Sequence, residues 1–229
     1  MDGKKRVLYS EAAYVIGMIT LAFGTALMEK ADFGLSMVVA PAYLLHLKIG
    51  AAFSWFTFGM AEYCLQAVLL VITSLFMKRF KPMYLFSFVT AVIYGFTLDG
   101  MMALMSFLPV TGYVLRGVYY VLGLVFCSIG VTFFFKTYIA PEAYELLVKE
   151  IAFGLKKSVT KTKTVYDCCS CAVAIALSFA FFGFGHFEGV KLGTVVCALV
   201  NGYLIGRIDK AVDGLFTVKD AFGLRRFFE

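Results

Sequence analysis

Three polar side chains that are costly inside a membrane stand within otherwise apolar stretches of this sequence. Glu62 and Gln66 are one helical turn apart, so a helix places them on the same face. Asp99 belongs to the following apolar stretch, which runs in the opposite direction and places this acid at a similar depth. Because a charged side chain at the centre of a membrane helix costs about 2.5–3.5 kcal/mol, each residue requires either a partner or a function.

Two explanations fit the two acids. In the first, Glu62 and Asp99 line a cavity that receives a proton, a cation or an amine, because acids inside membranes mark proton and ion pathways. In the second, Glu62 forms hydrogen bonds within the helix bundle, and Asp99 pairs with Arg116 near the outer end of the next apolar stretch. We favour the first explanation for Glu62 and leave both open for Asp99.

The segment 33–49 is apolar, but it is too short to cross a membrane and return, and Pro41 interrupts it. Such a segment is tolerated at membrane depth only where protein buries it or where it lines a cavity. Glycine and proline free backbone groups that can then bind a ligand, as the broken helices of transporters do. We therefore expect a re-entrant or broken segment, with Asp32, Ser36 and Tyr43 as candidate ligand-binding residues.

No metal site or enzyme active site is predicted. Cys168, Cys169 and Cys171 lie close together, but no second cluster or histidine pair completes a set of four metal ligands. We interpret these cysteines as small packing residues at helix contacts. The sequence lacks a phosphate-binding glycine loop, a His-Glu-x-x-His motif and a nucleophile elbow. We therefore expect neither catalysis nor a cofactor, and nothing indicates binding to nucleic acid.

The elements that must position the polar candidates are membrane-spanning helices. The chain is 61% hydrophobic and only 16% charged. Its apolar residues form runs of the length, roughly 20 residues, that crosses a hydrocarbon core of about 30 Å. The alternating pattern of a membrane barrel is absent, so the spans must be helices. The six predicted spans are Val7–Met28, Trp55–Met77, Met83–Leu108, Gly112–Phe135, Cys168–Gly185 and Leu192–Gly206.

The basic residues predict that both termini are cytoplasmic. With the N-terminus inside, all but four of the 21 lysines and arginines fall on the inner side, as expected for cytoplasmic loops. The segment 136–167 holds six of these lysines and is expected to be a solvated cytoplasmic loop. The segment 211–229 mixes apolar side chains with basic ones, which predicts an amphipathic helix on the inner leaflet.

The chain also contains an internal repeat. Residues 24–30 align with 130–136, residues 40–45 with 140–147, and residues 91–98 with 198–205. We infer two repeats, 1–110 and 111–229. Each repeat holds three spans, so the second is inverted relative to the first, an arrangement found in many secondary transporters. The alignment sets Asn201 opposite Tyr94, and Asn201 either binds a substrate or bridges helices.

Several short motifs resemble those of the YczE/YitT-like family of small bacterial integral membrane proteins. The motifs are residues 31–36 with 40–43, and residues 189–194 with 201–202. The resemblance covers most of the chain and implies a location in the bacterial inner membrane, but it implies no substrate. The second repeat lacks an equivalent of the Asp-Phe-Gly-Leu-Ser stretch, so we expect an asymmetric site.

The hypothesis is an all-α membrane protein in which six transmembrane helices form two inverted three-helix repeats with a re-entrant or broken segment. It would transport a small solute or cation at a site between the repeats. An ion channel and a non-transporting scaffold or regulator are the alternatives. The expected partners are the lipid bilayer and the solute or cation, and a homodimer is compatible with the pattern but not required. The predicted binding residues are Glu62, Gln66, Asp99, Asp32, Ser36, Tyr43 and Asn201.

Overall fold

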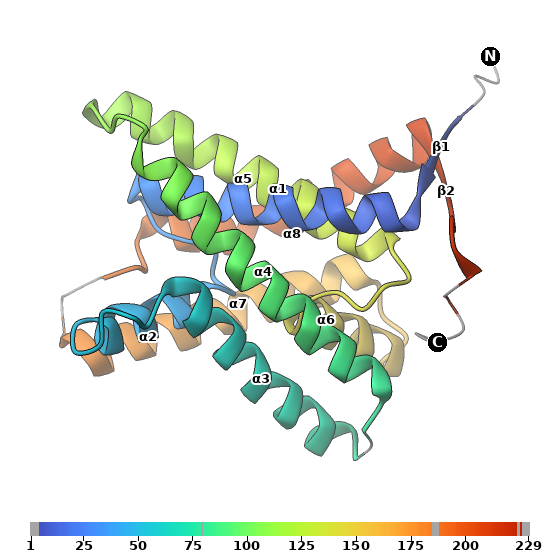
Figure 1. Cartoon of the computed structure of the whole chain (residues 1–229), viewed down its shortest axis with the longest axis horizontal. Helices are drawn as coiled ribbons and strands as arrows, with labels where there is room; N and C mark the ends of the chain where they lie inside the picture. The colour runs from blue at the N-terminus through green and yellow to red at the C-terminus, as the bar shows by residue number, and fades with distance from the viewer. Residues whose placement is uncertain (1–4, 79, 185–187, 224, 226–229) are drawn as a thin grey trace.

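The protein is built almost wholly of α-helices (Figure 1), and the computed structural model describes residues 5–78, 80–184, 188–223 and 225. Six helices, α1, α3, α4, α5, α7 and α8, are long and apolar enough to cross a membrane. This confirms the predicted all-α membrane protein with six spans. In chain order the elements are β1 (Arg6–Tyr9), α1 (Ser10–Ala31), α2 (Ala40–Gly50), α3 (Phe58–Met77), α4 (Pro82–Ser106), α5 (Gly112–Lys136), α6 (Ala143–Gly154), α7 (Val159–Phe182), α8 (Leu192–Leu215) and β2 (Phe216–Lys219).

The residues at several helix ends account for where the helices begin. Thr57 caps α3, because its hydroxyl accepts a hydrogen bond from the backbone N–H of Met60 at 3.1 Å. Pro41 lies in the first turn of α2, where a residue without an N–H group is tolerated. The predicted broken segment 33–49 therefore consists of an irregular stretch followed by a short helix that Pro41 helps to start.

The spans α7 and α8 differ most from those predicted, whereas the bounds of the other four lie within about three residues of the prediction. Helix α7 begins at Val159 rather than Cys168, because Lys163 and Asp167 in its first turns are paired inside the protein instead of facing water. The predicted end of this span, Gly185, lies outside the described residues. Helix α8 continues beyond the predicted Gly206 to Leu215.

The segment 136–167 is not the predicted solvated loop. It contains α6, and this helix buries much of its length inside the bundle. The expectation failed because the six lysines were counted as solvated, whereas the apolar residues between them supply a buried face. The buried residues of α6 are Ala143, Tyr144, Glu145, Leu146, Val148 and Ala152.

The predicted amphipathic helix over 211–229 is also wrong. Helix α8 ends at Leu215, and Phe216–Lys219 forms β2, which pairs in parallel with β1. The β-branched pair Thr217 and Val218 favours an extended backbone, and the pairing satisfies backbone groups that a terminal tail would leave to water. Positions 224 and 226–229 of the predicted helix lie outside the described residues.

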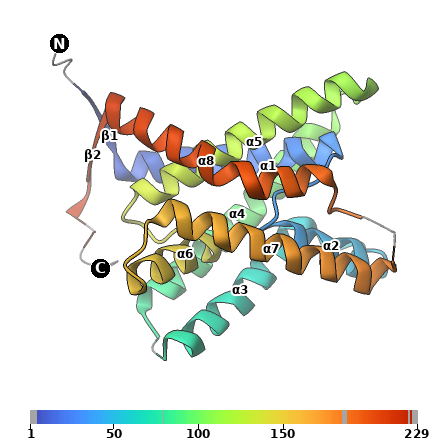
Figure 2. The same ribbon diagram turned by 180° about the vertical axis from the view of Figure 1, so that it is seen from behind.

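Helices α1 and α5 form the centre of the bundle and run side by side. Figure 1 shows α4 crossing this pair on one face, and Figure 2 shows α8 on the opposite face. The two halves of the chain repeat the same order of one long, one short and two long helices. The contacts match as well, since α1 touches α4 as α5 touches α8, and α2 touches α3 as α6 touches α7. The inverted relation between the halves stays a prediction.

Glycines allow α1 and α5 to approach closely. A Cβ atom added at Gly24 would lie 2.7 Å from the carbonyl oxygen of Gly123, and one added at Gly130 would lie 2.7 Å from that of Gly17. The two glycine pairs are seven residues apart on each helix, which fits an antiparallel crossing. Small residues of this kind allow the close packing that drives helix association in membranes.

We expect Gly24→Ala to lower the free energy of unfolding by about 1–3 kcal/mol, because the added methyl group meets backbone atoms that cannot move independently. Gly100→Ala is the control, since a Cβ atom there has no neighbour within 4 Å and the substitution is also within a helix. Thermal unfolding of both variants in detergent measures the difference. Equal midpoints for the two variants would show that the α1–α5 contact does not depend on Gly24.

Candidate functional site

A small closed cavity lies between the two halves of the bundle. Its volume is about 20 Å³, which is enough for one water molecule. Residues of α1, α4, α5, α7 and α8 line it, together with the irregular stretch before α2 and the start of α6. Every lining residue is buried, so the cavity is sealed from both ends of the protein. The polar lining residues are Thr25, Ser36, Tyr94, Glu142, Tyr144, Glu145, Lys163 and Asn201.

Gln66 joins two buried acids on one side of this cavity. Its amide nitrogen donates hydrogen bonds to Glu142 Oε2 at 2.8 Å and to Glu62 Oε2 at 3.3 Å. Its amide oxygen accepts a hydrogen bond from the backbone N–H of Ala143 at 3.0 Å. The Tyr144 hydroxyl also donates to Glu62 Oε2, at 3.0 Å. The arrangement attaches the first turn of α6 to the middle of α3.

Lys163 joins two further acids on the other side. Its Nζ lies 3.3 Å from Glu145 Oε1 and 3.1 Å from Asp167 Oδ1. Asn201 donates to Asp167 Oδ2 at 3.3 Å and accepts a hydrogen bond from the Ser128 hydroxyl at 2.9 Å. These contacts connect α5, α6, α7 and α8 through buried polar groups.

The start of α6 is held in position by α4. The Thr90 hydroxyl donates to the carbonyl oxygen of Ala140 at 2.8 Å, and the Ser87 hydroxyl donates to that of Pro141 at 2.6 Å. Both hydroxyl groups are buried. They satisfy the backbone of the non-helical turn that precedes α6, as irregular backbone inside a membrane protein requires.

The two groups of residues together, called the central cluster below, bury more acid than base. Each charged residue of the cluster is at most 1% exposed. Three carboxyl oxygens, Glu62 Oε1, Glu142 Oε1 and Glu145 Oε2, have neither a hydrogen-bond partner nor an ion pair. A buried site of low polarity cannot hold several uncompensated negative charges, so protons or cations must neutralise them. The members of the cluster are Glu62, Gln66, Glu142, Tyr144, Glu145, Lys163, Asp167 and Asn201.

Glu142 shows this effect outside the membrane-spanning helices. Burial, reinforced by the neighbouring carboxyl groups of Glu145 and Glu62, raises the pKa of Glu142 well above its ordinary value. The donor Gln66 and the Lys163 ammonium oppose this rise but do not cancel it. The shift therefore favours the protonated form of Glu142 over the carboxylate.

Four of the seven predicted site residues belong to the cluster or its cavity. Glu62 and Gln66 are in the hydrogen-bond network, Asn201 bridges Asp167 and Ser128, and Ser36 lines the cavity. Glu62 Oε2 therefore has hydrogen-bond partners within the bundle, as the structural explanation expects. Glu62 Oε1 has none, as expected of an acid that binds a proton or a cation.

The other three predicted residues lie elsewhere. Asp99 accepts hydrogen bonds from the Thr57 hydroxyl at 2.7 Å and from the backbone N–H of Gly59 at 2.9 Å, so it stabilises the start of α3. The predicted pairing of Asp99 with Arg116 is wrong, because Arg116 lies 3.6 Å from Asp32 instead. Tyr43 donates a hydrogen bond to Glu29 at 3.3 Å, away from the central cavity.

Sequence reasoning missed three members of the central cluster at α6, which are Glu142 at its cap, Tyr144 and Glu145. It also missed Lys163 and Asp167 on α7. These residues were assigned to a solvated loop because charge is concentrated there. A signal was nevertheless present, since residues 140–147 align with residues 40–45. The first copy was predicted to enter the membrane, and the same expectation applied to the second copy would have placed Glu142 and Glu145 inside.

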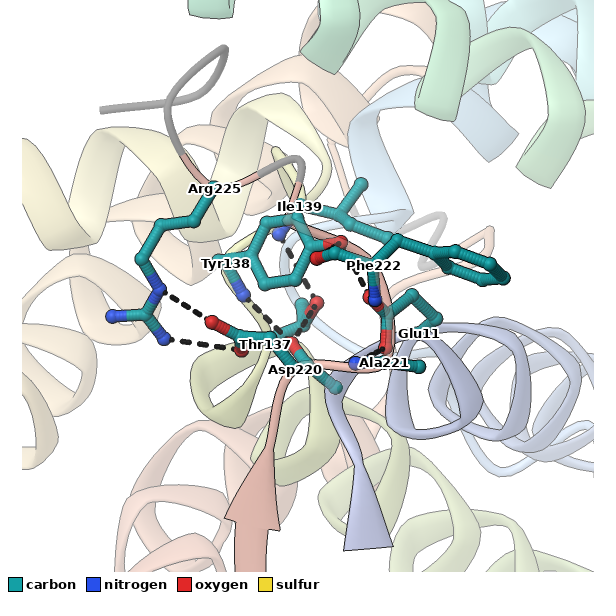
Figure 3. Close-up of polar contacts among 9 residues, drawn as sticks. Glu11, Thr137, Tyr138, Ile139, Asp220, Ala221, Phe222 and Arg225 are labelled. Atoms are coloured by element: carbon teal, nitrogen blue, oxygen red, sulfur yellow. Dashed lines mark hydrogen bonds and ion pairs between the residues drawn. The ribbon is translucent and has the colours of Figure 1, made fainter.

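Contacts between the two halves close each end of the bundle. At the end away from the termini, Lys191 forms an ion pair with Asp32 at 2.5 Å. At the end that holds the termini, Glu11 accepts hydrogen bonds from the backbone N–H groups of Ala221 and Phe222 at 3.0 Å and from the Tyr138 hydroxyl (Figure 3). Neither end leaves the central cavity open.

We expect the stability of the protein to fall as pH rises above the ordinary pKa of a glutamate, which is 4.5. Below this pH Glu142 is protonated in both the folded and the unfolded chain. Above it the unfolded chain releases the proton first, so the free energy of unfolding decreases, by at most about 1.4 kcal/mol per pH unit for one group. Glu142→Gln should reduce this slope, measured by thermal unfolding from pH 5 to pH 8.

Glu150→Gln is the control for this experiment, because Glu150 lies on the same helix but pairs with Lys81 outside the cluster. It should leave the slope unchanged. A slope that is the same in wild type and Glu142→Gln would contradict the assignment of a bound proton to Glu142. Glu62, Gln66, Glu145 and Lys163 surround Glu142 and are intact in both variants.

Comparison with known proteins gives one family. No curated protein and no solved structure is significantly similar to the chain. The model of a family of unknown function, DUF6198, matches residues 8–210, which include both halves and the whole central cluster. This match does not test the resemblance to YczE/YitT-like proteins, which stays a prediction. The chain belongs to the DUF6198 family of unknown function.

Proposed function

We propose that the protein is a secondary transporter of a small solute or cation, and that the central cavity is part of the translocation path. The observation that carries this proposal is a sealed cavity, lined by both halves of the chain, beside buried carboxyl oxygens that lack partners. Buried acids of this kind bind and release protons or cations when a cavity opens to water. In this interpretation the structure is the occluded state.

The arrangement of the two halves supports alternating access. Two pairs of residues that the repeat alignment matches line the cavity from both halves. The pairs are Tyr94 with Asn201, and Thr25 with Val131. If the halves are inverted repeats, exchanging their conformations closes one end while opening the other. The matching helix contacts of the two halves are what this exchange requires.

The residues then divide into three roles. Glu62 and Glu142, with Gln66 and the other charged residues of the central cluster, form the group that binds the proton or cation, and Asn201 orients Asp167 at the cavity wall. Asp32 closes one end through Lys191 and Arg116 rather than contacting the solute. We further propose a location in the bacterial inner membrane with cytoplasmic termini, as the distribution of basic residues indicates.

Cys127 allows a test that needs no knowledge of the solute, because it lines the cavity and is 3% exposed. We expect a variant that retains only this cysteine to react with a membrane-impermeant maleimide added from either side of the membrane. A matched variant that retains only Cys197, which is 1% exposed and does not line the cavity, should react much more slowly.

The labelling pattern separates the alternatives. A transporter exposes Cys127 to one side of the membrane at a time. Cross-linking the end away from the termini, so that this end stays closed, should therefore abolish labelling from that side only. A channel would expose it to both sides at once. Cys127 that reacts no faster than Cys197 from either side would contradict the proposal and favour a scaffold.

A further inference from the structure

We propose that a monovalent metal cation takes the place of the Lys163 ammonium group between its two carboxylates, and that the protein thereby exchanges one cation for one proton. The inference rests on the proposed function and specifies the class of substrate and the coupling. Its basis is the position of the Lys163 ammonium group, which lies between two carboxylates at the edge of the sealed cavity.

The position of Lys163 is unusual for a structural lysine. Its side chain is completely buried, and its Nζ lies 3.3 Å from Glu145 Oε1 and 3.1 Å from Asp167 Oδ1. Asn201 holds the second oxygen of Asp167, so this carboxylate is fixed in orientation. The ammonium group is therefore a cation bound between oriented oxygen atoms.

The surroundings hold more oxygen atoms than the ammonium group uses. Glu142 Oε1 and Glu145 Oε2 are buried without hydrogen-bond partners, and both residues line the same cavity as Lys163. Buried polar atoms almost always have partners, so two such oxygens beside one cavity indicate a missing ligand. Carboxylate oxygens are the ligands that hard cations prefer.

Cavity size and charge restrict the ligand. A volume of about 20 Å³ accepts a water molecule or a dehydrated monatomic cation but no organic solute. Within the described part of the chain, no set of three or more acidic, histidine or cysteine side chains is arranged to hold a metal ion. This fits a site that the ammonium group of Lys163 occupies, with its carboxylates spread around that group.

The exchange step balances in charge and in atoms. The Lys163 N–H bond breaks, the proton passes to water on the side to which the cavity is open, and the amine becomes neutral. A monovalent cation binds Glu145 and Asp167 in its place, so the net charge of the central cluster does not change. Lysine suits this role because its amine can lose a proton once a cation neutralises the two carboxylates that hold the ammonium group, whereas arginine keeps its charge.

The test uses the full-length protein in detergent, in weakly buffered solution with a pH-indicator dye. Addition of lithium, sodium or potassium chloride should release up to one proton per protein molecule for at least one of these cations, and choline chloride should release none. The apparent affinity for that cation should rise about tenfold per pH unit, because one cation and one proton compete for the site.

Three variants identify the source of the proton. Lys163→Arg keeps the ion pairs but cannot lose a proton, so it should show neither proton release nor stabilisation by the cation. Lys163→Gln should still be stabilised by the cation, with an affinity that no longer depends on pH. Lys149→Gln is the control, because partial burial lowers the pKa of Lys149 to about 8 and makes it the rival proton source. It should release protons as the wild type does.

The outcomes separate this inference from the proposed function. Proton release that persists in Lys163→Arg, or that disappears in Lys149→Gln, would show that Lys163 is not the exchanging group. If no cation releases protons while Cys127 still becomes accessible from each side, the proposed transport function stands and the proposed cation–proton exchange is wrong. If Cys127 is also inaccessible, the proposed function fails too. Lys163→Arg preserves the buried ion pairs, so this variant still decides the question if Lys163→Gln does not fold.

Discussion

The burial of four carboxyl groups with a single ammonium group is the constraint on which the rest of this structure depends. Charges in a medium of low polarity must be paired, hydrogen-bonded or neutralised by protons. Gln66 and Tyr144 supply donors to Glu62, and Lys163 and Asn201 hold Asp167. The remaining carboxyl oxygens without partners are the reason to assign the central cluster a function rather than a structural role alone.

The fold can be understood as the framework that this cluster requires. Helix α6 must enter the bundle to bring Glu142 and Glu145 beside α3 and α7, and the hydroxyl groups of Ser87 and Thr90 satisfy the turn that leads into it. Close packing of α1 against α5 through glycines brings Thr25 and Cys127 to the cavity wall. Contacts between the halves at both ends then seal the cavity, which keeps water from the cluster in this state.

The sequence was sufficient for the spans and for part of the site. Apolar length determines a membrane helix, and polar residues such as Glu62, Gln66 and Asn201 stand out against an apolar background. Lys163 and Asp167 do not stand out, because they occur among other charges where solvation is the ordinary expectation. Only the packing of α6 and α7 shows that these two are buried. The place of Asp99 outside the central cluster was hidden for a related reason. Its partners Thr57 and Gly59 belong to a different predicted span, and helix capping leaves little signal in the sequence.

The central claim is that protons neutralise part of the buried acid of this cluster. Infrared spectroscopy of the purified protein at neutral pH tests it most directly, because a protonated carboxyl group has a carbonyl band that a carboxylate lacks and that shifts in D2O. We predict such a band in the wild-type protein, with part of its intensity lost in Glu142→Gln. A spectrum with no protonated carboxyl band at neutral pH would contradict the account.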